Sequence, residues 1–340
     1  MSQSRLSLAL SAEGALPPEG PVAVFGAAAG ADLSGIARGR VTVIQGFRPD
    51  HDAWAAAGYR VMPVAEGAFA AAVVCIPRSR AAARAAVAEA AAHVPGGATI
   101  WVDGQKTDGI DAVLRELKGR VALSAPVAKA HGKAARFASP GTAAFADWAG
   151  ADLHPAPGFV APPGAFSADA PDPGSVLLAG ALPADLKGRV VDPGAGWGWL
   201  AAQVLARPGV VSVDLVEADH AALAAARRNV GDPRAAFHWA DARTFRPDAP
   251  CDAVVMNPPF HDGRTANPRL GAEFIRAAAR MLTGSGVLWM VANRHLPYEP
   301  VLKAAFREVA EVAGTGAFKV IRASHPVRDR SVVRPARKPR

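Results

Sequence analysis

Short apolar segments rich in β-branched residues alternate with helical patterns through both halves of the chain. Strands that alternate with helices in this way pack into a mostly parallel sheet covered by helices on both faces. The pattern therefore predicts an α/β protein with two doubly wound, Rossmann-like domains. The expected strands are Val22–Phe25, Val41–Ile44, Ala71–Ile76 and Ala98–Val102 in the first half, and Arg189–Asp192, Val211–Glu217, Ala253–Met256 and Val287–Ala292 in the second.

The two halves also resemble each other in order and composition. The first half contains, in this order, the segment 72–77, an Ala/Arg-rich helical stretch, a glycine pair and the strand with Trp101. The second half contains a matching series: Ala253–Pro258, the helical pattern Glu273–Leu282, Gly284 with Gly286, and the strand with Trp289. An offset of about 180–190 residues is far longer than a solenoid repeat and favours a domain duplication. A chance match between two Ala-rich segments is the alternative.

The chain has 340 residues, whereas domains usually run to about 100–200 residues, so two domains are expected. Between the halves, Asp152–Pro173 is dense in Pro, Ala and Gly and shows little periodicity. We expect a first domain over 1–150, a linker or extended arm over 151–175 and a second domain over 176–325. Residues 326–340 form a basic tail with too few apolar residues to fold independently.

The charge balance favours a polyanionic partner. The formal net charge is +8 and the pI is about 10.0, and basic side chains that neutralise phosphates release condensed counterions on binding. Charge alone does not show where such a partner binds, and many basic proteins bind no nucleic acid.

Neither of the two cysteines suggests a metal site or a disulfide. Cys75 and Cys251 each lie in or beside an apolar run, without the spacing of either kind of site, so both are expected to be core thiols. The first ten residues lack a basic segment followed by a long apolar stretch, and no run approaches the roughly 20 apolar residues that span a bilayer. We expect a cytoplasmic protein without a membrane segment.

A glycine-rich turn indicates where a cofactor binds. The strand Arg189–Asp192 runs into Pro193–Gly198, and the helical pattern Trp199–Ala206 follows at once. Glycines let the backbone approach a ligand closely, and the helix start offers unpaired N–H groups. We predict that Asp192, Gly194 and Gly196 contact a nucleotide-type cofactor.

Two acidic residues extend this predicted cofactor site. Glu217 ends the next strand about twenty residues on, where its carboxylate can accept hydrogen bonds from both ribose hydroxyls. Asp241 ends a further short strand and can meet an adenine amino group, although a solvated strand end is an equal alternative for it. These residues do not distinguish a nicotinamide cofactor from S-adenosylmethionine.

The segment Asn257-Pro258-Pro259-Phe260 makes that distinction. It follows the apolar strand Ala253–Met256 and so opens onto the ligand crevice of a doubly wound sheet. The side-chain oxygen of Asn257 and the carbonyl of Pro258 can both accept from one aromatic –NH₂ group, turning its lone pair towards a methyl donor. Phe260 can stack on the flat base. Because such an amine is a poor nucleophile, positioning supplies most of the rate enhancement.

The sequence offers little support for covalent or metal-assisted catalysis. No Ser/His/Asp or Cys/His set with a nucleophile context stands out, and no metal-ligand spacing is present. His261 and Asp262 are either a base or a cap of the next loop, and the cap is favoured. The amine proton can leave to water after transfer, so no dedicated base is required.

The second half resembles the tandem-domain bacterial ribosomal RNA guanine-N(2)-methyltransferases, in the first place the small-subunit 16S type. The resemblance covers roughly residues 163–324. It implies two class I methyltransferase domains in tandem, S-adenosylmethionine as cofactor, catalysis by the second domain and small-subunit ribosomal RNA as partner. The residues that carry it are Pro163–Ser167, Gly174-Ser175, Asp192–Gly198, Asn257–Gly263, Val291–Asn293, Leu296–Tyr298 and Gly316–Val320.

In that family the first domain is a degenerate copy that helps to bind RNA, and this chain agrees. It has Cys75–Arg78 where the second half has Asn257–Phe260, and its turn Gly26–Gly30 lacks the preceding acidic residue. One departure is Trp197 and Trp199 in the cofactor turn, where the family usually has smaller or aliphatic residues.

The resemblance also implies further ligand contacts. Phe166 packs over the methionine end of the cofactor. Substrate contacts are expected from Pro259 and His261 beside the catalytic segment, from Lys106 in the polar loop 103–109, and from Arg328 and Arg330 in the basic tail. A plain surface loop is an equal alternative for Lys106, and a solubilising tail is the alternative for the two arginines.

Several other functions remain open. One alternative target is a guanine of large-subunit 23S RNA, and another is the amide of a protein glutamine, which Asn-Pro-Pro-Tyr enzymes of similar fold methylate. Adenine N(6) methylation follows the same motif logic. A non-catalytic ribosome assembly factor that retained the fold is the alternative from another class, and the intact Asn257–Phe260 segment with Glu217 argues against it.

Overall fold

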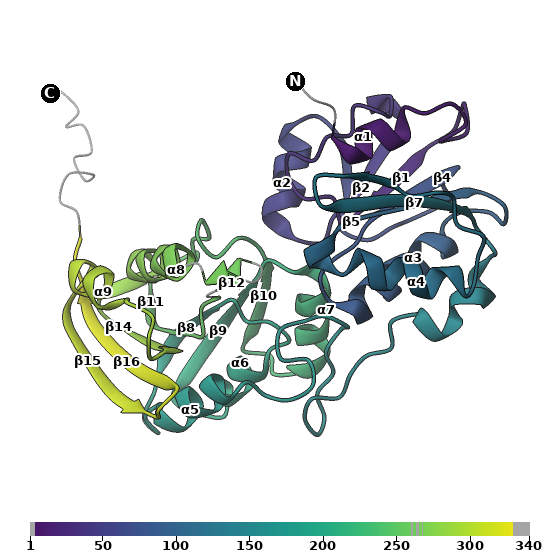
Figure 1. Ribbon diagram of the computed structural model, residues 1–340. Coiled ribbons are helices and arrows are strands. Elements are labelled where there is room, and N and C mark those ends of the chain that lie inside the picture. Colours follow the sequence, from purple (N-terminus) through teal and green to yellow (C-terminus); the bar gives the residue numbers. More distant parts are fainter. Residues whose placement is uncertain (1–3, 260, 263–264, 267, 329–340) are drawn as a thin grey trace, which may run out of the picture. The chain divides into compact units, whose positions relative to one another are not determined.

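The computed structural model describes residues 4–259, 261–262, 265–266 and 268–328 (Figure 1). The chain forms two compact units. The first comprises Met1–Ala170 with Ala218–Ala225, and the second comprises Pro171–Glu217 with Ala226–Arg340. The predicted linker 151–175 is thus divided, since residues up to Ala170 go with the first unit.

The first unit contains a seven-stranded sheet in the order β3-β2-β1-β4-β5-β7-β6. The first five strands in this order run parallel, and β7 and β6 are antiparallel to their neighbours. The strands are β1 Val22–Phe25, β2 Val41–Ile44, β3 Arg60–Met62, β4 Ala71–Cys75, β5 Thr99–Gln105, β6 Val127–Lys129 and β7 Gly132–Ala138; the helices are α1 Arg5–Leu10, α2 Arg48–Ala56, α3 Arg80–Ala92 and α4 Ile110–Lys118, with 3-10 turns η1 Arg38–Arg40, η2 Lys106–Asp108 and η3 Thr142–Trp148.

The second unit repeats this sheet, in the order β10-β9-β8-β11-β14-β16-β15, with the last two strands again antiparallel. A short hairpin of β12 and β13 stands apart from it. The strands are β8 Gly188–Pro193, β9 Val210–Glu217, β10 Ala235–Trp239, β11 Cys251–Met256, β12 His261–Asp262, β13 Thr265–Ala266, β14 Leu282–Asn293, β15 Phe306–Gly314 and β16 Phe318–Pro326; the helices are α5 Pro173–Ala181, α6 Trp199–Leu205, α7 His220–Asn229, α8 Pro268–Met281 and α9 Glu299–Ala305.

The identical strand order confirms the predicted fold, two mixed, mostly parallel sheets in tandem, and supports the domain duplication. The register also corrects the sequence alignment of the halves. Trp101 pairs with Val73 and Trp289 pairs with Val255, so these two valines are equivalent. Position 72 therefore matches Val254, one residue later than the sequence pattern suggested.

All eight strands predicted with bounds are present, β10 is the short strand expected before Asp241, and the predicted helices correspond to α3, α6 and α8. The sheet strands missed by the prediction lie at a sheet edge or run antiparallel: β3, β6, β7, β15 and β16. In β15 most side chains are exposed, so its sequence lacks the continuous apolar run of a buried parallel strand.

Apolar side chains fill both faces of each sheet. On β11, Val254 and Met256 belong to one cluster and Ala253 and Val255 to another, as the two-residue period of a strand requires. Helix α8 covers one face with buried residues spaced three and four apart, among them Phe274, Ile275 and Ala278. This packing fixes the end of β11, from which Asn257 projects.

Both cysteines are free thiols, as expected for core residues. Burial raises the pKa of Cys75 and of Cys251 to about 12, so both are protonated at neutral pH. Within the ranges described, no helix is both long and apolar enough to cross a membrane. Nor do those ranges contain a group of three His, Cys, Asp or Glu side chains able to hold a metal ion.

Candidate active site

The turn after β8 has the backbone conformation that the glycine pattern predicts. Gly194, Gly196 and Gly198 have φ angles of 82°, 55° and 87°, in the left-handed region that favours glycine. The N–H groups of Gly194 and Ala195 donate to the carbonyl of Val216 at the end of β9, at 2.8 and 3.2 Å. The turn is therefore held against the neighbouring strand, and α6 begins immediately after it.

Glu217 ends β9 beside this turn. Its Oε2 accepts a hydrogen bond of 2.8 Å from the N–H of Gly196. The structure thus brings Glu217 and the glycine turn together, although they are 21 residues apart in the chain. This is the edge where the carboxyl ends of parallel strands meet, the usual ligand site of such a sheet.

Asp192 lies at the end of β8 and is 1% exposed. Its Oδ2 has no hydrogen-bond partner among the described residues. Burial, followed by the negative charge of Glu217, raises the pKa of Asp192 to about 8. Because buried carboxylate oxygens normally have a partner, this atom fits a ligand that brings a donor or a cation.

Asp241 follows β10, as predicted, but its carboxylate already has a strong partner. Nε and Nη2 of Arg243 donate to it at 2.9 and 2.7 Å, and the backbone N–H of Arg243 donates at 2.8 Å. A contact between Asp241 and an adenine amino group would have to compete with this ion pair. That role stays a prediction.

Asn257 follows β11, and its side chain is held by two residues of α5. Nδ2 of Asn257 donates to Oδ2 of Asp172 at 2.8 Å and to Oγ of Ser175 at 2.9 Å. An ionised carboxylate only accepts hydrogen bonds, so the amide group of Asn257 must face Asp172 with its nitrogen. Both amide hydrogens are then in use. The atom of this side chain that remains for a ligand is Oδ1, an acceptor.

Asp172 has a second task as the N-cap of α5. Its Oδ2 also accepts from the backbone N–H of Ser175 at 2.7 Å, and Pro173 occupies the first helical turn. The sequence interpretation did not include Asp172 or Ser175 among the site residues. The run Asp172–Ser175 carries the signature of a helix start, which predicts the cap, but nothing in it indicates a contact with a residue 85 positions away.

The Asn-Pro-Pro segment lies next to the glycine turn. Pro258 is buried and Pro259 is exposed. A Cβ added at Gly194 would lie 3.9 Å from Cδ of Pro259, so the two segments are neighbours. Phe260 lies outside the described residues. The backbone of His261 pairs with that of Ala266 in the β12–β13 hairpin.

The other residues predicted to contact cofactor or RNA lie away from this site or outside the described residues. Phe166 belongs to the first unit, and its side chain is 61% exposed. Lys106 lies in η2 of the same unit. Arg328 donates from Nη2 to the carbonyl of Leu282 at 2.9 Å, and Arg330 lies outside the described residues. Their roles in binding cofactor or RNA stay predictions.

Equivalent positions of the first sheet carry different side chains. The N–H of Gly26 donates to Ile44 O as that of Gly194 donates to Val216 O, so the residues that follow, Gln45 and Glu217, are equivalent. The registers likewise match Val24 with Asp192 and Cys75 with Asn257. The first sheet therefore lacks both carboxylates and the amide.

The Gln45 side chain is bonded to the loop that corresponds to the glycine turn of the second sheet. Its Nε2 donates to the carbonyl of Ala27 at 2.8 Å, and its Oε1 accepts from the N–H of Phe47 at 2.9 Å. The indole N–H of Trp54 donates to the carbonyl of Ala27 at 2.9 Å. Gln45 and Trp54 are buried, so these bonds hold the loop from the protein interior.

The methyltransferase small domain family matches residues 157–322. The match spans just under half of the chain; it begins within the first unit and continues through most of the second. The matched range contains the glycine turn, Glu217, Asn257 and the two residues that hold it. The predicted resemblance at the level of the domain is therefore confirmed.

Among curated proteins, about half of the chain is similar to ribosomal RNA small subunit methyltransferase C. The Klebsiella pneumoniae protein is 40% identical over 167 residues, and the Salmonella arizonae protein is 35% identical over 166; each alignment covers 47% of this chain and 47% of the relative. The alignments thus span about half the length of the curated relatives.

Among solved structures, the chain resembles a T. thermophilus 16S rRNA N2 methyltransferase, determined in complex with AdoMet and guanosine. The TM-score is 0.76, with 23% sequence identity, and the match covers 95% of this chain and 92% of the other. At this identity the likeness establishes the fold, and it extends over both domains.

Proposed function

We propose that the protein transfers a methyl group from S-adenosylmethionine to the exocyclic 2-amino group of a guanine in 16S ribosomal RNA of the small subunit. The observation that carries the proposal is the fixed amide of Asn257, which offers an acceptor beside the glycine turn. The relatives named ribosomal RNA small subunit methyltransferase C support the choice of reaction and substrate.

The residues of the second domain fit S-adenosylmethionine. Oδ2 of Asp192 is a buried acceptor suited to the cationic amino group of the methionine part, and its pKa would fall on contact with a cation. We assign Glu217, at the end of β9, as the acceptor for the ribose hydroxyls. When bound, the cofactor supplies an electrophilic methyl group on a sulfonium.

The protein's own contribution to the reaction is positioning. Oδ1 of Asn257 and the carbonyl oxygen of Pro258 each accept a hydrogen bond from one N–H of the guanine 2-amino group. This leaves the face of the nitrogen towards the methyl group free. Since Asp172 and Ser175 already hold the Asn257 amide, no rotation of that side chain is needed when substrate binds, and this preorganisation lowers the barrier. The amine proton leaves to water after transfer.

The first domain contributes to binding rather than to chemistry. Its sheet carries Val24, Gln45 and Cys75 where the second carries Asp192, Glu217 and Asn257, and the Gln45 bonds occupy its loop. We place the enzyme in the cytoplasm, where ribosomal subunits are assembled.

Methyl transfer from radiolabelled S-adenosylmethionine tests the proposal. The substrates are 30S subunits, 50S subunits and their protein-free RNAs, all from a strain that lacks the gene, with Asn257→Ala as control. Label recovered as N(2)-methylguanosine in 16S RNA, and lost in the variant, is expected. Label in 23S RNA, in N(6)-methyladenosine or in protein glutamine would replace the proposed substrate by that one. Tight cofactor binding without any transfer would favour an assembly factor.

A further inference from the structure

One side of the first unit carries two adjoining cavities of about 400 Å³ each. The first lies between α4 and the strand β7, with Leu123 to Pro126 on its far side, and the second lies between η2, the start of α4 and the β6–β7 hairpin. Asp111 and Lys133 line both, so the cavities adjoin. Each is within the range of about 300–1,000 Å³ that holds a small organic ligand.

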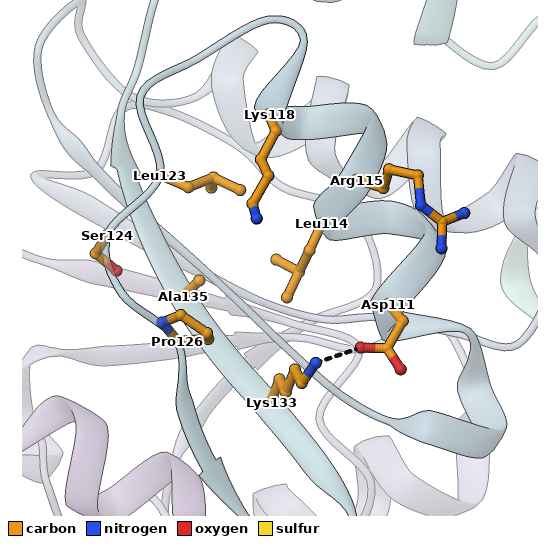
Figure 2. A pocket seen from close by; sticks show the side chains of 9 residues that line it. All are labelled: Asp111, Leu114, Arg115, Lys118, Leu123, Ser124, Pro126, Lys133 and Ala135. Carbon is orange, nitrogen blue, oxygen red and sulfur yellow. Dashed lines mark hydrogen bonds and ion pairs between the residues drawn. The ribbon is translucent and has the colours of Figure 1, made fainter.

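The rim of these cavities is cationic. Lys106 comes from η2, Arg115 and Lys118 come from α4, and Lys129 and Lys133 come from the hairpin. Figure 2 shows the Lys118 ammonium between α4 and Leu123, the Arg115 guanidinium extending from α4 away from Leu123, and the Lys133–Asp111 pair at the lower edge. One acidic residue, Asp111, lines the cavities, against five basic ones.

The neighbouring carboxylates do not neutralise this rim. Asp108 pairs with Arg78 at 3.1 Å. Glu116, on α4 between Arg115 and Lys118, pairs with Arg84 at 2.8 Å and with Arg80, both on α3. Asp111 is bound to Lys133 at 2.7 Å, and that hydrogen bond, with the charges of Lys133, Lys106 and Arg115, holds its pKa below the usual value. Three exposed cations, at 106, 115 and 118, therefore face the cavities beyond this pair.

The hairpin turn is held in an unusual conformation at the same place. Ala130 and His131 have φ angles of 50° and 59°, in the left-handed region that costs energy for any residue with a Cβ. The carbonyl of His131 accepts from the N–H of Lys106 at 2.9 Å, which joins the turn to the start of η2. Strained turns often persist at binding sites, because the surrounding structure maintains them.

Part of the wall of the first cavity is apolar. Leu114, Leu123, Pro126 and Ala135 form this part, and the hydroxyl of Ser124 lies beside it (Figure 2). A wall with apolar and cationic parts suits a nucleotide, whose sugar and base contact the apolar part while its phosphate meets Lys or Arg. Two adjoining cavities suit two successive nucleotides of one strand.

We propose that these two cavities bind the sugar-phosphate backbone of an RNA strand, with Lys106, Arg115 and Lys118 as the phosphate contacts. The proposal rests on the proposed function for the identity of the RNA, but not for the chemistry of the site. The cavities lie apart from the positions in the first sheet that correspond to the cofactor site. A contact with the RNA sugar-phosphate backbone therefore adds affinity without discriminating between bases.

Salt-dependent binding of a fluorescent single-stranded RNA oligonucleotide to the full chain tests this. Each lost phosphate contact lowers the slope of log K against log salt by about 0.7, which corresponds to about fivefold weaker binding at 0.1 M salt. We expect this for Lys106→Ala, Arg115→Ala and Lys118→Ala, and about 10²-fold weaker binding for the triple variant. Arg60→Ala is the matched control, because Arg60 is an exposed cation of the same unit and lines neither cavity.

The outcomes separate this inference from the proposed function. If the triple variant binds RNA with the wild-type slope, the inference is overturned even if guanine methylation is intact. If the slope falls by about 2 while S-adenosylmethionine binding is unchanged, the inference holds even if the wild type methylates no RNA. Displacement of the RNA by polyglutamate of equal charge at equal concentration would overturn it in favour of an acidic protein partner.

Discussion

Gln45 and Glu217 occupy the same place in the two sheets, directly after the strand residue whose carbonyl holds the first glycine of the turn. The carboxylate of Glu217 accepts a hydrogen bond from the backbone of its own glycine turn. The amide of Gln45 instead donates to the carbonyl of Ala27 and accepts from the N–H of Phe47. The second sheet therefore has a carboxylate at the position proposed to bind the cofactor, whereas the first has an amide bonded within its own loop.

This difference predicts the stoichiometry of cofactor binding. Titration calorimetry of the full chain with S-adenosylmethionine is expected to give one site per chain. The variant Gln45→Glu is expected to leave that number at one, because Val24 and Cys75 still stand where Asp192 and Asn257 are needed. Two S-adenosylmethionine sites in the wild type would contradict the proposal that the first sheet binds no cofactor.

Loss of Asp172 should reduce catalysis more than binding. In Asp172→Ala the amide of Asn257 loses its carboxylate partner and can rotate, so kcat is expected to fall about 10²-fold, the usual effect of a misplaced reacting group. The dissociation constant of S-adenosylmethionine and the KM for RNA should change little.

The matched variant for this experiment is Asp172→Asn, which keeps an oxygen for both Asn257 and the helix N–H. It should retain most of the activity. Both variants should be compared by thermal unfolding, since loss of the N-cap in Asp172→Ala costs about 0.5–2 kcal/mol. Equal kcat values for Asp172→Ala and wild type would show that Asn257 needs no partner.

The raised pKa of Asp192 predicts how the stability of the cofactor-free protein depends on pH. Its folded-state pKa of about 8 lies above the value of 3.8 expected when unfolded. The folded state therefore binds the proton more tightly, and the contribution of Asp192 to the free energy of unfolding falls as pH rises from about 4 to about 8.

The test compares wild type with Asp192→Asn by chemical unfolding at pH 5, 6, 7 and 8. The variant should gain stability relative to wild type as pH increases, because its amide never ionises. Saturating S-adenosylmethionine should reduce the pH dependence of the wild type, if its cationic amino group pairs with the carboxylate. A parallel pH dependence in both proteins would rule out a titrating Asp192.

The buried ion pair between Arg5 and Asp103 should be costly to break. Nε and Nη2 of Arg5 bind the two carboxylate oxygens of Asp103 at 2.7 and 2.9 Å, and both residues are less than 10% exposed. Asp103→Ala leaves a buried guanidinium unpaired and is expected to lower the free energy of unfolding by about 3–5 kcal/mol. Lys187→Ala, at an exposed site, should change it by less than about 0.5 kcal/mol. Urea denaturation measures both.

Sequence patterns predicted the parts of this protein that local chemistry determines. Buried parallel strands such as β1 and β4 are unbroken apolar runs, so their positions followed from the sequence almost to the residue. Glu217 and the glycine turn were expected to meet because both lie at the carboxyl ends of adjacent parallel strands.

The features that sequence did not reveal depend on contacts between distant residues. Asp172 reaches Asn257 from a Pro-rich segment with no periodicity, and only the folded chain places α5 at the end of β11. The pairing of Asp241 with Arg243 is local, yet a sequence contains no measure of which partner a carboxylate prefers. The edge strands were missed because exposed strands alternate polar with apolar side chains.

The orientation of the Asn257 amide has one more chemical consequence. Its outward atom can satisfy a group that carries a hydrogen and repels one that presents a lone pair. In guanine, O6 and N7 are acceptors and carry no hydrogen, so neither can be held by this contact. If the proposed function holds, the two hydrogen bonds on the far side of the side chain, to Asp172 and Ser175, thus exclude O6 and N7 from this contact and so from alkylation.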